Sequence, residues 1–193
     1  MRIVAGVWRG RRLVSPKGEG TRPTSDRVRE ALFSSLVARL GADLGAGPVL
    51  DLFAGSGALG LEALSRGASR AVLVEKDRGA QLSIAQNVAH MEATERVKVV
   101  GADTLGPALD RVAKMGPFVL LFVDPPYRID QAKVAKGLTR LGRAGGLAFG
   151  APVAWEHSSG SKVPEPEGFA IERTYKYGDT AVTLLRFYEG EDA

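Results

Sequence analysis

The chain has 193 residues, of which 45% are hydrophobic and 25% are charged, and its net charge at pH 7 is +4. This composition is ordinary for a soluble globular protein, and the length suits one domain with a sizeable core plus a short extension. With no cysteine, two histidines and no apolar stretch of membrane-spanning length, the sequence excludes disulfides and thiolate zinc sites, and we expect a metal-free cytoplasmic protein.

The positive charge is concentrated in the first forty residues. They hold nine bases and three acids, a balance of +6 that leaves −2 for residues 41–193. Eight of the nine bases are arginines, whose planar guanidinium can donate two hydrogen bonds to one phosphate. Residues 1–40 are therefore a candidate phosphate-binding surface, with an ordinary solvated strip as the alternative.

The amino-terminal region is predicted to contain a β-hairpin, a linker and a helix. Short strands at residues 2–7 and 11–14 flank a turn at Arg9-Gly10. Residues 16–24 are rich in glycine and proline, which is typical of a linker. From Ser25 to about Leu40 apolar residues recur every four positions, which predicts an amphipathic helix.

An alternation of strands and helices follows Gly47. The predicted strands are 48–53, 71–75, 97–100 and 118–123, and the predicted helices are 58–66, 78–90 and 104–114. Short connections between such units imply a parallel sheet with helices on both faces. Residues 170–175 and 181–188 predict a final hairpin, so we expect an α/β, Rossmann-like, mostly parallel sheet with an antiparallel edge hairpin.

A glycine loop follows the first of these strands and opens a helix. It reads Gly55-Ser56-Gly57-Ala58-Leu59-Gly60, and glycines let a ligand approach the backbone while the helix start presents free amides. Glu75 ends the next strand, where a carboxylate can accept both hydroxyls of a ribose, and Asp103 can reach an adenine amine. This pattern also fits a nicotinamide oxidoreductase, but the chain is too short for a second nucleotide-binding half, which favours S-adenosylmethionine.

The turn Asp124-Pro125-Pro126-Tyr127, here called the acceptor turn, follows the fourth strand and emerges at the same sheet edge as the glycine loop. The Asp124 carboxylate and the Pro125 carbonyl can accept the two hydrogens of a planar amine, whose lone pair is otherwise delocalised. The prolines fix that carbonyl, and Tyr127 can stack on a base. The alternative is a rigid turn without function, because Asp and Pro are common turn residues.

Other polar and aromatic residues have less specific interpretations. Trp8 either stacks on an unpaired base or caps the hairpin against the domain. Trp155 and His157 are interpreted as packing or surface residues rather than catalysts, and Asn87 as structural.

Taken together, these motifs resemble the bacterial RsmD family, the 16S rRNA guanine-N2 methyltransferases. The resemblance rests on Met1-Arg-Ile-Val-Ala-Gly6, Arg9-Gly-Arg-Arg-Leu13, residues 22–33, the loop from Asp51 to Ala68, the acceptor turn, and Lys176-Tyr-Gly-Asp179. The resemblance covers nearly the whole chain. Ala5, where glycine is expected, and Gly150-Ala-Pro152, which interrupts the region of the fifth strand, depart from the family pattern.

The resemblance implies methyl transfer from S-adenosylmethionine to the N2 amine of a guanine in 16S rRNA of the assembling small ribosomal subunit. We expect the protein to be a monomer. Residues 1–24 would grip RNA and residues 25–193 would form the class I methyltransferase domain. The implied cofactor-binding residues are Thr24, Arg27, Asp51, Phe53, Ala54, Gly55, Ser56, Gly57, Glu75, Lys76, Asp103 and Asp124. The implied RNA-binding residues are Arg2, Trp8, Arg9, Arg11, Arg12 and Arg22, and the acceptor turn at Asp124, Pro125, Pro126 and Tyr127 would be catalytic.

Three other functions stay open from the sequence. The acceptor turn alone also fits DNA adenine-N6 or other amino-methyltransferases, although a target-recognition domain is missing. The glycine loop alone fits a small oxidoreductase. A non-catalytic RNA-binding assembly factor with a vestigial pocket would also carry the basic amino terminus.

Overall fold

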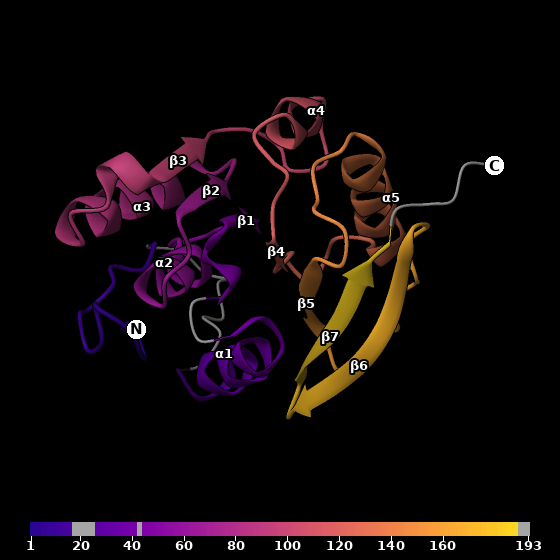
Figure 1. Cartoon of the computed structure of the whole chain (residues 1–193), viewed down its shortest axis with the longest axis horizontal. Coiled ribbons are helices and arrows are strands. Elements are labelled where there is room, and N and C mark those ends of the chain that lie inside the picture. The colour runs from indigo at the N-terminus through magenta and orange to yellow at the C-terminus, as the bar shows by residue number, and fades with distance from the viewer. Residues whose placement is uncertain (17–25, 42–43, 189–193) are drawn as a thin grey trace.

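The computed structural model describes residues 1–16, 26–41 and 44–188, and Figure 1 shows how their elements are arranged. In chain order these are α1 (Asp26–Leu40), η1 (Leu44–Ala46), β1 (Pro48–Leu52), α2 (Ala58–Ser65), β2 (Arg70–Val74), α3 (Arg78–His90), η2 (Thr94–Arg96), β3 (Val97–Val100), α4 (Ala108–Ala113), β4 (Leu120–Val123), α5 (Gln131–Arg143), β5 (Pro152–Ser158), β6 (Phe169–Tyr177) and β7 (Thr180–Phe187). Within these ranges no helix is both long and apolar enough to cross a membrane.

The strands form one seven-stranded sheet in the order β3-β2-β1-β4-β5-β7-β6. The first five in that order run parallel, and β7 is antiparallel to β5 on one side and to β6 on the other. The predicted α/β architecture with an antiparallel hairpin at one edge is therefore confirmed. Strand order reverses between β1 and β4, and ligands of open α/β sheets bind beyond the carboxyl ends of the strands at such a point.

Helices cover both faces of the sheet, which explains the nearly continuous apolar runs of the central strands. One core packs α1, α2 and α3 against the face that carries Val49, Leu73 and Phe122. The other core packs α4 and α5 against the opposite face, where Leu50 and Val123 lie. Both faces of the sheet are therefore covered, and a site can form in the loops at the carboxyl ends of its parallel strands.

The amino-terminal segment, residues 1–16, forms a shorter hairpin than predicted. Its two arms pair at an antiparallel bridge between Arg2 and Arg12, flanked by bonds from the Ile3 amide to the Arg11 carbonyl and from the Leu13 amide to the Met1 carbonyl. Beyond this short pairing, side chains of α2 bind the backbone: Val4 and Ala5 donate to Glu62, and Trp8 donates to Ser65. The predicted strand over residues 2–7 is therefore cut short, and the segment is docked on α2.

Two further differences concern helices. The helix expected at residues 104–114 begins only at Ala108, after Pro107, and α5 has no counterpart in the sequence-based assignment. The Gly150-Ala-Pro152 segment makes the turn into β5, with Gly150 at a φ of 74° that a glycine tolerates.

Candidate active site at the carboxyl edge of the sheet

The glycine loop turns sharply out of β1. Phe53, Gly55 and Gly57 all have positive φ values, of 63°, 56° and 77°. A Cβ on Gly55 would meet nothing within 4 Å, so the loop is open to a ligand there. At Gly60, by contrast, a Cβ would lie 2.3 Å from the Leu73 side chain, so this glycine lets α2 pack closely on β2. The loop therefore combines an open side with a tightly packed base.

Glu75, at the end of β2, lies directly against this loop. Its two carboxylate oxygens accept hydrogen bonds from the Gly55 amide at 2.8 Å and from the Asp77 amide at 2.8 Å. Lys76, between them, is exposed. The structure thus brings Glu75 and the glycine loop together as the sequence indicated, and the contact of Glu75 with a ribose stays a prediction.

Asp51 is a buried carboxyl group beneath the loop, with 1% of its surface exposed. Its Oδ2 accepts from the Gly60 amide at 3.0 Å, whereas Oδ1 has no hydrogen-bond partner among the described residues. Burial raises the pKa of Asp51 to about 7, the Glu75 charge adds to the rise, and the Gly60 amide opposes it. Asp51 is therefore a buried carboxyl group next to the loop that holds its proton more strongly than an exposed aspartate does.

The acceptor turn Asp124-Pro125-Pro126-Tyr127 emerges beside the glycine loop. The Asp124 amide donates to the carbonyl of Leu52, the last residue of β1, at 3.4 Å. Tyr127 is 47% exposed, and its hydroxyl lies 3.0 Å from the Thr180 hydroxyl at the start of β7. The turn is thus held between β1 and the final hairpin, with the Tyr127 ring accessible from solvent.

The other predicted cofactor residues differ in how far the structure describes them. Asp103 follows β3 and is exposed, and its carboxylate accepts from the Leu105 amide at 3.1 Å. Ala54 and Ser56 are buried within the loop. Thr24 and Arg22 lie outside the described residues, and Arg27 is on the first turn of α1 with its side chain outside them too.

The amino-terminal segment presents arginines to solvent but not its tryptophan. The exposed arginines are Arg2, Arg9, Arg11 and Arg12. Trp8 is only 9% exposed, and the Arg96 guanidinium lies 5.7 Å from the centre of its ring. Because this burial leaves little of the ring for a base to stack on, the structure favours the packing interpretation of Trp8 over RNA stacking.

Glu62 is a buried anchor that the sequence analysis did not single out. Its side chain is fully buried and accepts from the Val4 amide at 2.7 Å, the Ala5 amide at 3.0 Å and Arg66 Nε at 2.8 Å. Ser65 donates to the Ala5 carbonyl at 2.6 Å. The available signal was a glutamate and a serine inside an otherwise apolar helix, because buried charge is retained only where it is paired.

Trp155 and His157 are both packing residues in β5. Trp155 is fully buried, and the His157 ring contacts the Ser158 carbonyl at 2.8 Å and the Thr183 hydroxyl at 2.9 Å. Burial lowers the pKa of His157. Neither residue reaches the site, in line with the interpretation that they are not catalysts.

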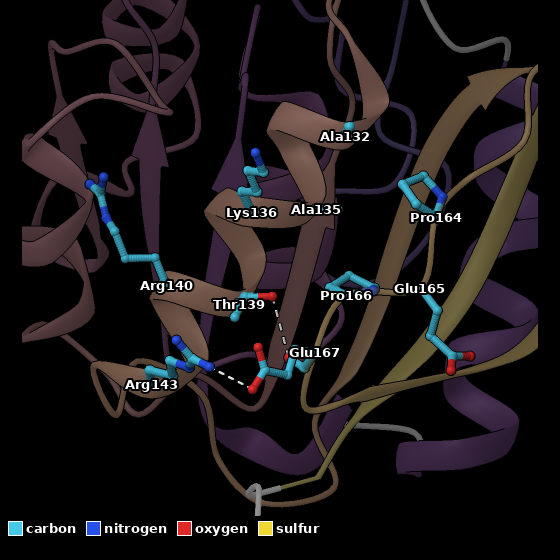
Figure 2. Close-up of a pocket in the computed structure, with 10 residues that line it drawn as sticks. All are labelled: Ala132, Ala135, Lys136, Thr139, Arg140, Arg143, Pro164, Glu165, Pro166 and Glu167. Atoms are coloured by element: carbon cyan, nitrogen blue, oxygen red, sulfur yellow. Dashed lines mark hydrogen bonds and ion pairs between the residues drawn. The ribbon is translucent and has the colours of Figure 1, made fainter.

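A groove of about 510 Å³ lies elsewhere, between α5 and residues 164–167 (Figure 2). Its wall combines cations of α5 with Glu167, which accepts from Arg143 at 2.5 Å and whose carbonyl accepts from Thr139 at 3.4 Å. No residue of the glycine loop or acceptor turn lines it. The described residues also contain no cluster of three or more potential metal ligands.

Comparison with known proteins places the chain among methyltransferases. A family model described as Conserved hypothetical protein 95 matches residues 1–186. The chain is 39% identical over 188 residues to the Ribosomal RNA small subunit methyltransferase D of Escherichia coli, covering 96% of this chain and 89% of that protein. It is 35% identical to the Putative rRNA methyltransferase YlbH of Bacillus subtilis, covering 96% and 98% respectively. The solved structure of the putative methyltransferase yhhF from Escherichia coli matches with a TM-score of 0.79 and 37% identity, covering 98% of this chain and 99% of that one.

Proposed function

Because this chain belongs to the RsmD family, whose model is described as Conserved hypothetical protein 95, we propose that it methylates the exocyclic N2 amine of a guanine in 16S rRNA. The methyl donor is S-adenosylmethionine, and the substrate is the assembling small ribosomal subunit. The observation that carries this proposal is the bond between the Asp124 amide and the Leu52 carbonyl, because it joins the acceptor turn to the strand that enters the glycine loop.

The residues of the glycine loop fit this cofactor. The open side at Gly55 admits a ligand close to the backbone, and the Glu75 carboxylate beside it can exchange its amide partners for ribose hydroxyls. Negative charge on Glu75 and Asp103 suits a cofactor with a positively charged sulfonium and a sugar diol. When bound, S-adenosylmethionine supplies an electrophilic methyl group.

The acceptor turn then orients the amine. The Asp124 carboxylate and the Pro125 carbonyl accept its two hydrogens, which turns the nitrogen lone pair toward the methyl carbon. With the donor bound, the amine held in this way would be the methyl acceptor, and the Asp124 carboxylate would receive the proton that the methylated nitrogen gives up. Tyr127 stacks on the guanine, which holds the amine in place.

The exposed arginines of the amino-terminal segment supply the RNA contact. Arg2, Arg9, Arg11 and Arg12 all face solvent. The family resemblance adds Arg22 as a further RNA contact and Thr24 and Arg27 as cofactor contacts. If Arg9, Arg11 and Arg12 contact phosphates, their triple replacement by alanine lowers the slope of log affinity against log salt by about 2 for single-stranded RNA, roughly 0.7 per contact.

Labelled S-adenosylmethionine tests the reaction. Small-subunit particles from cells lacking this protein should gain label at one guanine, and Asp124→Ala should abolish turnover while keeping much of the cofactor affinity. Asp110→Ala is the matched control, because it removes a carboxylate of α4 that pairs with Arg140 outside the site. Label found only on DNA or protein, or an Asp124→Ala enzyme with full turnover, would refute the proposal.

A further inference from the structure

Asn87 is a buried amide that touches both the amino-terminal segment and the glycine loop. It lies on α3 with 1% of its surface exposed. Its Oδ1 accepts from the Val14 amide at 2.7 Å, and its Nδ2 donates to the Val14 carbonyl at 2.9 Å and to the Ser56 carbonyl at 2.9 Å. One side chain therefore joins two segments that are 42 positions apart in the sequence.

The geometry makes this contact sensitive to the positions of both segments. Both hydrogens of the Asn87 amide group are used, one for each segment, so a movement of either Val14 or Ser56 leaves a buried polar group unpaired. Ser56 lies between Gly55 and Gly57, and the positive φ values of these glycines set the direction of its carbonyl. The loop conformation thus decides whether Asn87 can hold Val14.

The remainder of the segment is fastened to the helix that the glycine loop opens. Glu62 and Ser65 of α2 bind its backbone, and a Cβ on Gly6 would lie 1.9 Å from the Ser65 carbonyl oxygen. Those contacts dock the segment on α2, but they do not reach the loop itself. Asn87, on α3, binds both the segment and the loop.

We propose that Asn87 is a positioning residue that couples RNA binding on the amino-terminal segment to cofactor binding in the glycine loop. A cofactor that fixes the loop fixes the Ser56 carbonyl, which fixes the Asn87 amide and with it Val14. Occupancy of either site therefore raises the affinity of the other by the same factor, as linkage requires. This inference rests on the proposed function.

Binding measurements on the full chain test the coupling. The dissociation constant for small-subunit particles from cells lacking this protein is measured with and without saturating S-adenosylhomocysteine. For the wild type we expect tighter binding with the cofactor product, by about 5-fold or more, the lower end of typical couplings. For Asn87→Leu we expect the two dissociation constants to agree within about 2-fold.

A matched control separates coupling from general damage to α3. Ser83 lies one turn before Asn87, is buried, and donates only within the helix, to the Gly79 carbonyl at 3.3 Å. Ser83→Ala should keep the wild-type coupling. The coupling ratio, unlike an affinity alone, does not change when a substitution merely weakens one site.

Hydrogen exchange of the wild type supplies a second test that needs no variant. Adding S-adenosylhomocysteine without RNA should slow exchange of the Val14 amide, which donates to Asn87. Unchanged exchange at Val14, or equal coupling in the wild type and Asn87→Leu, would overturn the inference. If particles and cofactor both bind and methylation proceeds but without coupling, the inference alone fails, whereas absence of methylation overturns the proposed function itself.

Discussion

Replacing Asp51 by asparagine is expected to change how stability depends on pH. Burial raises the pKa of Asp51 from its usual value of 3.8 to about 7 in the folded chain. Between these values the folded state holds a proton that the unfolded state has released. Stability therefore falls as pH rises, and Asp51 lowers it by roughly 1.4 kcal/mol per pH unit and by roughly 4 kcal/mol in total as an upper bound.

Asparagine keeps a carbonyl oxygen for the Gly60 amide and removes the ionisation. All other titrating groups are shared by the two proteins, so they largely cancel in the difference. The free energy of unfolding is measured with urea for both cofactor-free proteins at several pH values between about 4.5 and 7.5. The value for Asp51→Asn minus the value for the wild type should increase as pH rises.

Salt provides the control for this experiment. Because desolvation is the largest cause of the shift and the Glu75 charge a smaller one, the pH-dependent difference should largely persist in 1 M salt, where the Debye length is about 3 Å. Two stability curves that run parallel across the pH range would refute the buried, proton-holding state of Asp51.

Substitutions at three other positions have defined outcomes. Glu62→Ala leaves two partly buried amides and the partly buried Arg66 guanidinium without their partner and should lower the urea-measured free energy of unfolding by about 3 kcal/mol, and a loss below about 1 kcal/mol would contradict this. Gly6→Ala places a Cβ 1.9 Å from the Ser65 carbonyl oxygen and should release the amino-terminal segment to limited proteolysis while the domain stays folded; unchanged cleavage would count against the docked segment. Tyr127→Phe loses only the hydroxyl contact with Thr180 and should keep most of kcat/KM, whereas Tyr127→Ala should lower it roughly 5- to 150-fold, the worth of stacking on one base. Equal losses for the two Tyr127 variants would remove stacking as the role of the ring.

The sequence predicted the sheet because its central strands are short apolar runs between helical patterns, and that signal is local. It also placed Glu75 and the acceptor turn at the edge that carries the glycine loop, since the carboxyl ends of parallel strands share an edge. The helix α5 could have been found too. Val134, Leu138 and Leu141 recur at helical spacing after Asp130, whose side chain accepts from the Ala132 amide.

The amino-terminal hairpin is shorter than predicted for a reason that no local pattern reveals. Its arms pair only around Arg2 and Arg12, and the amides that follow bind Glu62 and Ser65, which lie about sixty positions away. In the same way, Asn87 has an ordinary place on an amphipathic helix, and only the fold shows that Val14 and Ser56 meet there. Tertiary hydrogen bonds of this kind override local preference.

The position of β7 sets an order of events during synthesis. β7 is the last of the described strands in chain order, yet it lies between β5 and β6, and among these strands β6 pairs with β7 alone. A ribosome that has released only residues up to β6 has therefore produced a strand with no neighbour to join. The Tyr127 partner Thr180 is also still missing at that stage. The sheet and the acceptor turn thus reach their final form together, as the last strand inserts, so a partly made chain is not expected to act on RNA.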